Sequence, residues 1–116
     1  MNNLSIVVLD GNLVADPEIK SVKGDKSVAN FSIAVNHEFA SKEGNHHVSY
    51  FHIECWDKLA ASCGQFLKKG SRITIRGELR QDRWKDESGK TQSRVKIVAQ
   101  AVRFDSKQKK HEEEAA

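Results

Sequence analysis

The chain has 116 residues, 38% of them hydrophobic and 30% charged, and 19 Lys and Arg against 16 Asp and Glu give a formal net charge of +3. This length predicts a single domain, and a mildly basic chain is compatible with a polyanionic partner. The absence of a hydrophobic segment long enough to cross a bilayer, and of a secretory signal pattern, excludes a membrane span and favours a cytoplasmic protein.

The first third of the chain predicts two strands and a hairpin turn. A hydrophobic run at 4–9 resumes at 13–14, and Gly11 between them predicts a bulge or bend in one strand. The segment 23–26, Lys-Gly-Asp-Lys, is typical of a hairpin turn. Hydrophobic and polar residues then alternate over 28–36, which predicts a half-buried strand.

A polar segment at 37–48 predicts a hairpin arm that leads into a strand with two unlike faces. Successive side chains of a strand point to opposite sides of the sheet. One face of the strand is hydrophobic and holds Phe51, Ile53 and Cys55. The other is aromatic and polar and holds Val48, Tyr50, His52, Glu54 and Trp56. Two flat rings beside an imidazole are suited to stacking a planar group at a wet surface.

One helix and two further strands follow. The helix is predicted from hydrophobic residues at helical spacing, with Asp57 as N-cap and Gly70 as its end: Leu59, Cys63, Phe66 and Leu67. Alternation over 72–80 predicts a strand with Ile73, Ile75 and Leu79 inside, and a turn at 86–89 leads to a last strand whose inner face holds Val95, Ile97, Ala99 and Ala101.

Five strands with one helix between the third and the fourth give an all-β protein with one short helix. This order is that of a five-stranded oligonucleotide-binding (OB) fold barrel, here with extended hairpin loops. We expect the barrel domain to span 1–105 and a short, disordered, charged tail to span 106–116.

Eight aromatic residues are present, and the predicted core accounts for Phe31, Phe51 and Phe66. Four others have no predicted core position: Phe39, Tyr50, Trp56 and Trp84. Exposed rings stack the bases of single strands, and neighbouring cations neutralise the phosphates. Cations do lie near these rings, since Lys58 follows Trp56 while Arg80, Arg83 and Lys85 flank Trp84. An ordinary solvated surface explains any one of these cations equally well.

Neither catalysis nor a cofactor is predicted. No nucleophile elbow, glycine-rich phosphate loop or zinc-deaminase motif occurs. A metal site formed by Cys55 and Cys63 with His46 and His47 was weighed, but the cysteine spacing fits no zinc pattern. Both thiols are expected to be buried in the core.

Five segments together resemble the bacterial single-stranded DNA-binding protein family. They are GNLVADPE at 11–18, VANFSIAVN at 28–36, SYFHIECWDKLA at 49–60, FLKKGSRITIRGELR at 66–80, and Trp84 with Asp86, Ser88 and Gly89. The resemblance runs nearly from the start to about Phe104. It implies an OB-fold that binds single-stranded DNA without sequence preference in replication, repair and recombination, usually as a homotetramer.

The resemblance also implies the residues that contact DNA. The base-stacking rings fall at Phe39, Tyr50, Trp56 and Trp84, the basic contacts at Lys20, Lys58, Lys69, Arg80 and Arg83, and His52 at a position that faces the ligand. The family's long linker and its acidic tip with a terminal aromatic have no match, so partner recruitment through the tail is not carried over. The alternatives are a single-stranded RNA-binding or primosome-type protein of the same fold, and a structural oligomer whose exposed rings pack between subunits.

Overall fold

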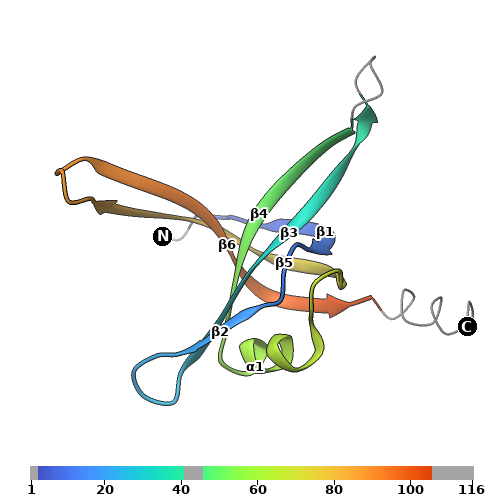
Figure 1. Ribbon diagram of the computed structural model, residues 1–116, viewed down its shortest axis with the longest axis horizontal. Coiled ribbons are helices and arrows are strands. Elements are labelled where there is room, and N and C mark those ends of the chain that lie inside the picture. Colours follow the sequence, from blue (N-terminus) through green and yellow to red (C-terminus); the bar gives the residue numbers. More distant parts are fainter. Residues whose placement is uncertain (1–2, 41–45, 106–116) are drawn as a thin grey trace, which may run out of the picture.

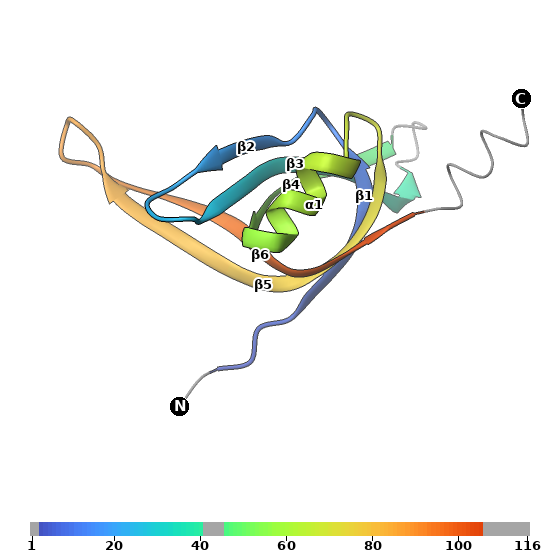
Figure 2. The same ribbon diagram turned by 90° about the horizontal axis from the view of Figure 1, so that it is seen from below.

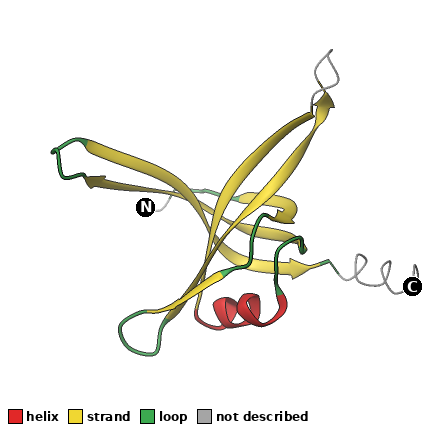
Figure 3. Cartoon of the chain, in the orientation of Figure 1, coloured by secondary structure: helices red, strands yellow, loops and turns green. Residues whose placement is uncertain are grey.

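The computed structural model describes residues 3–40 and 46–105, apart from the side chains of 38–40 and 46. The predicted turn of the arm after 40 and the predicted tail 106–116 lie outside the described residues. The elements in chain order are β1 (Val7–Leu13), β2 (Glu18–Ser21), β3 (Ser27–Ala40), β4 (His46–Trp56), α1 (Asp57–Phe66), β5 (Arg72–Lys85) and β6 (Thr91–Phe104). In the described residues strands dominate and there is one short helix, which confirms the predicted class (Figure 3).

The strands close into a ring of five. The sheet order is β1-β5-β6-β4-β3-β2, and an additional pairing of β1 with β3 completes the ring. All pairs are antiparallel except β4 with β6, where Ile53 pairs with Ile97 in a parallel ladder. Helix α1 covers one opening of this ring (Figure 2). The arrangement is consistent with the predicted OB-fold barrel, and the short β2 is an extra strand on the edge of β3.

The bend predicted in the first strand lies where β1 changes partners. Val7 to Asn12 pair with β5, whereas Asn12 and Leu13 pair with β3. Gly11 makes this close approach possible, because a Cβ there would lie 2.5 Å from the carbonyl oxygen of Ala34. The strand begins at Val7 rather than at the predicted Leu4, which is exposed.

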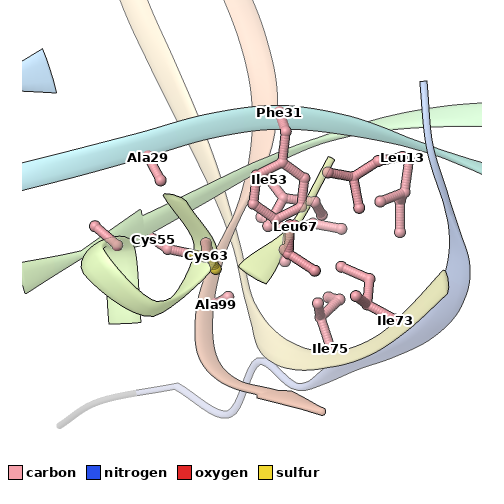
Figure 4. Close-up of a cluster of buried hydrophobic side chains, with 13 residues drawn as sticks. Leu13, Ala29, Phe31, Ile53, Cys55, Cys63, Leu67, Ile73, Ile75 and Ala99 are labelled. Carbon is pink, nitrogen blue, oxygen red and sulfur yellow. The ribbon is translucent and has the colours of Figure 1, made fainter. Parts of the chain in front are cut away.

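The core fills the inside of the ring. Its largest fully buried side chains come from four of the five ring strands and from the helix: Ile33, Ile53, Ile73, Ile75, Ile97, Cys55 and Cys63 (Figure 4). The two free thiols are buried as predicted, with Cys63 Sγ 3.8 Å from Cys55 Sγ. The hydrogen bond that Cys55 shares with Cys63, together with burial, raises the pKa of Cys55, so this thiol stays protonated. Among the described residues, no group of three or more His, Cys, Asp or Glu is arranged to hold a metal ion.

Two of the hairpins extend beyond the barrel as arms (Figure 1). In one of them, β5 and β6 stay paired as far as Lys85 and Thr91. This arm overturns part of the predicted core, because Leu79 and Val95 are exposed although they lie on the inward side of their strands. Alternation predicted the side correctly, but β1 pairs with β5 only as far as Gly77, so the ring is open beyond that residue.

The structure also corrects both ends of the predicted helix. Trp56 is the N-cap, not Asp57, which instead is the first helical residue and has a positive φ of 55°. Phe66 is 60% exposed, although it was predicted in the core. It lies about 120° around the helix from the buried Ala60, and its ring packs against Phe104 of β6 with centroids 5.7 Å apart. The helix ends at Phe66, and Leu67 takes the buried position instead.

Within the described part of the chain, no helix is long and apolar enough to cross a membrane.

Candidate nucleic-acid interface

Strand register brings the polar face of β4 and one side of the β5/β6 arm onto a single continuous surface. Glu54 of β4 pairs with Asn30 of β3 and with Val98 of β6, and Val98 pairs in turn with Glu78 of β5. Paired residues of neighbouring strands point to the same side of a sheet. Alternate residues from this row therefore share what we call the outer face, which includes Lys20, Asn30, Tyr50, His52, Glu54, Trp56, Glu78, Arg80, Asp82, Trp84, Arg94 and Lys96.

Three of the four predicted stacking rings lie on the outer face and remain open to solvent. Tyr50 is 66% exposed, Trp56 38% and Trp84 47%. Tyr50 and Trp56 come from β4, at either end of the row that contains His52 and Glu54, whereas Trp84 lies near the end of the β5/β6 arm. The backbone of Phe39 belongs to β3, but its side chain lies outside the described residues.

The predicted cations divide into two groups. Lys20 and Arg80 lie on the outer face, where each forms a salt bridge with a neighbouring carboxylate, at 3.4 Å to Glu18 and 2.6 Å to Glu78. The other three are exposed but lie off this face. Lys58 is in the first turn of α1, two residues after Trp56, and Arg83 points to the opposite side of the arm from Trp84. Lys69 is in the loop after α1, where its backbone N–H donates to Asp16 Oδ1 at 2.7 Å.

His52 sits on the outer face as a neutral ring. Its Nε2 lies 2.9 Å from Asn30 Oδ1, which fits an N–H that donates to the amide oxygen. Burial lowers the pKa of His52, and the positive charges of Arg94 and Lys96 lower it further. At neutral pH this residue therefore offers hydrogen bonds rather than a charge.

Behind the rings lies a buried polar network that sequence reasoning missed. Glu54 Oε1 accepts a hydrogen bond from Trp56 Nε1 at 2.6 Å, and Glu54 Oε2 accepts one from Lys96 Nζ at 2.7 Å. The same ammonium lies 3.0 Å from Asp82 Oδ2. Hydrogen bonds to the two carboxylates raise the pKa of Lys96 despite an opposing effect of desolvation. Alternation along β6 shows that Lys96 points to the other side of the sheet from Ile97. Only the pairing of β6 with its neighbouring strands shows which residues it contacts.

In the row around Glu54 and on the β5/β6 arm, the outer face carries four cations and four carboxylates: Lys20, Arg80, Arg94 and Lys96, and Glu18, Glu54, Glu78 and Asp82. Among the described residues, Arg94 is the one of these four cations without a salt bridge. β5 continues the outer face past Glu78 with the exposed Arg76, which forms no salt bridge with a described residue, and with Arg72, which is paired with Asp10 and Asp105.

A closed five-stranded barrel with exposed rings and interspersed cations on one face defines an oligonucleotide-binding barrel. Comparison with known proteins narrows this class. Residues 4–105 match the model of the single-strand binding protein family, and the chain belongs to this family.

Three relatives are similar to this chain over most of its length. The chain is 36% identical to "Single-stranded DNA-binding protein 2" of Chlorobaculum tepidum, over 98% of the chain and 79% of that protein. It is 34% identical to the single-stranded DNA-binding protein of Caldanaerobacter subterraneus, over 87% of the chain and 67% of that protein. A third relative, the single-stranded DNA-binding protein of Oceanobacillus iheyensis, is 33% identical over 87% of the chain. The matched region covers only 63% of the length of that third relative.

Proposed function

We propose that this protein binds single-stranded DNA without sequence preference. The observation that carries the proposal is the presence of three exposed rings, Tyr50, Trp56 and Trp84, on one continuous outer face. Each offers a flat surface to a base of any identity. The names of the relatives support DNA rather than RNA as the strand that is bound.

The contacts follow from these positions. Bases stack on the three rings and on Phe39, and Nδ1 of the neutral His52 ring accepts a hydrogen bond from a base edge. Phosphates are neutralised by cations within the outer face and around it: Lys20, Lys58, Lys69, Arg80, Arg83 and Arg94. Because three of the four cations around Glu54 and on the arm are already paired with carboxylates, stacking contributes a larger share of the affinity than in a strongly basic groove.

The biological role that fits such binding is to coat and protect single strands during replication, repair and recombination, without catalysing a reaction. We further propose that the protein acts in the cytoplasm at the nucleoid and assembles as a homo-oligomer, with a tetramer as the expected state. Exposed hydrophobic side chains at the start of the chain, Leu4, Ile6 and Val8, support an interface between copies. Light scattering with and without a dT oligonucleotide measures the number of subunits.

Fluorescence titration tests the binding. Both tryptophans of the chain lie on the outer face, so a dT oligonucleotide is expected to quench the emission strongly, and the affinity is expected to fall as salt rises. A U oligonucleotide of equal length is expected to bind more weakly, and a blunt duplex is expected not to quench. Unchanged emission with dT at low salt would refute the proposal, and tighter binding of U would instead support an RNA-binding function.

A further inference from the structure

Glu54 holds a negative charge in the middle of a surface that we propose to bind a polyanion. Its side chain is only 11% exposed, and both of its oxygens are engaged, one by Trp56 and one by Lys96. A buried carboxylate is unfavourable by several kcal/mol unless it is paired. A hydrophobic residue at this position would avoid both the burial of a charge and the repulsion of phosphates, so the carboxylate needs another explanation.

The hydrogen bond from Trp56 supplies part of that explanation. An indole has two side-chain torsions, and a bond at Nε1 fixes the direction in which the ring plane faces. The polar edge of Trp56 is turned toward Glu54, while the side chain as a whole remains 38% exposed. A ring that is already oriented loses less conformational entropy when a base stacks on it.

Lys96 supplies the other part, because its ammonium joins three strands. It projects from β6 and reaches Glu54 of β4 and Asp82 of β5 at 2.7 and 3.0 Å. Asp82 lies two residues before Trp84 on the arm that leaves the barrel. One charged group, itself 13% exposed, thus connects the strand that carries Trp56 to the arm that carries Trp84.

We propose that Glu54 and Lys96 are positioning residues for base stacking. Glu54 orients the indole of Trp56, and Lys96 fixes the arm, so that Trp56 and Trp84 are held at a set separation before DNA arrives. The inference rests on the proposed binding of single-stranded DNA and extends it to two largely buried side chains that are bonded to each other and to their neighbours on the outer face.

The sign of a charge change separates positioning from plain electrostatics. Glu54→Ala removes a negative charge from the outer face, so an electrostatic role alone predicts tighter binding of a dT oligonucleotide. Positioning predicts the opposite, a loss of about three- to tenfold for one hydrogen-bonded group. Glu18→Gln is the matched control, since it removes a carboxylate from the same row of the outer face but leaves the network intact. We expect the control to bind dT as tightly as the natural chain or more tightly.

Ring mobility gives a readout that does not require DNA. In a Trp84→Phe background, Trp56 is the single tryptophan, and its fluorescence anisotropy reports how firmly the ring is held. Glu54→Ala is expected to lower this anisotropy and to increase quenching by acrylamide. Glu54→Gln, whose amide oxygen still accepts from Nε1, is expected to restore most of the anisotropy and of the dT affinity.

The arm is tested in the reciprocal background, Trp56→Phe, where Trp84 is the reporter. Lys96→Met keeps the length of the side chain but removes the ammonium, and it is expected to lower the anisotropy of Trp84. Lys85→Met removes a cation from the same arm outside the network and is expected to leave it unchanged. Circular dichroism verifies the fold of each variant, and the near-isosteric Lys96→Met carries the test if Glu54→Ala does not fold.

Two results would overturn this inference without affecting the proposed function. In the first, the natural chain binds dT, and a folded Glu54→Ala variant binds dT equally well or better and shows the same Trp56 anisotropy. The other is a Lys96→Met variant whose Trp84 behaves like that of Lys85→Met. Failure of the natural chain itself to bind dT would refute the proposed function, and with it any role of this network in stacking.

Discussion

Replacement of Trp84 by alanine offers a clean measurement of base stacking on this surface. The side chain is 47% exposed and lies on a two-stranded arm beyond the barrel, so its removal leaves little cavity, and we expect it to change the free energy of unfolding by less than about 0.5 kcal/mol. For barrels of this class, stacking on an aromatic ring is worth about 1 to 3 kcal/mol per base. The arm is attached to the barrel over fewer strands than β4, which favours the lower half of that range. We therefore expect binding about 5- to 30-fold weaker.

The assay is the fluorescence anisotropy of a labelled dT oligonucleotide at several salt concentrations, because the substitution itself alters the intrinsic emission. Trp84→Ala removes no charge, so the dependence of log affinity on log salt is expected to stay unchanged while every affinity falls by the same factor. Val95→Ala, an exposed hydrophobic truncation on the opposite side of the same arm, is expected to leave dT binding unaltered. Dissociation of the oligomer with unchanged DNA affinity would show that Trp84 packs between subunits and would refute the stacking role.

Three further predictions concern charge, pH and packing. Lys58→Ala is expected to make the salt slope shallower by about 0.7 units if this exposed cation contacts one phosphate; an unaltered slope would remove Lys58 from the interface. Because the pKa of His52 is lowered by folding, the unfolded chain binds more protons just below pH 6.5. Stability contributed by a neutral His52 is therefore complete above that pH, falls as the pH drops, and levels off below the folded pKa. Denaturant titrations between pH 5 and 8 are expected to show this decline, and His52→Gln to lack it. Gly77→Ala would place a Cβ 2.2 Å from the carbonyl oxygen of Val98, and we expect it to lower stability by about 1 to 3 kcal/mol in thermal unfolding.

The exposure of the candidate rings could be predicted from the sequence. Exclusion from the core selected Phe39, Tyr50, Trp56 and Trp84, and the last three are exposed on one face. Phe66 was misassigned, because helical spacing shows which residues share a stripe but not where the packed stripe ends. The hydrophobic alternation of Leu79 and Val95 failed for a related reason. Period two identifies the inward side of a strand but carries no information on whether the barrel extends that far.

The buried network was beyond reach from sequence for a more general reason. Glu54, Lys96 and Asp82 lie on three strands, and their neighbours in sequence are ordinary strand residues. Only the parallel pairing of β4 with β6, together with the register of the β5/β6 arm, brings the three side chains together. The charge pattern of the sequence cannot predict that contact, since the residues next to a lysine do not show whether its ammonium is exposed or buried.

The sequence by itself determined the five ring strands, the helix α1, the family and the rings left over from the core, because each of these depends on local periodicity or on ordered segments along the chain. Tertiary structure alone decided which of those rings share a surface, that most cations around Glu54 are paired with carboxylates, and that Trp56 is held by a carboxylate and the arm by a lysine. The physical reason is register, since a strand shows which residues share a face but only its pairing determines what lies beside them.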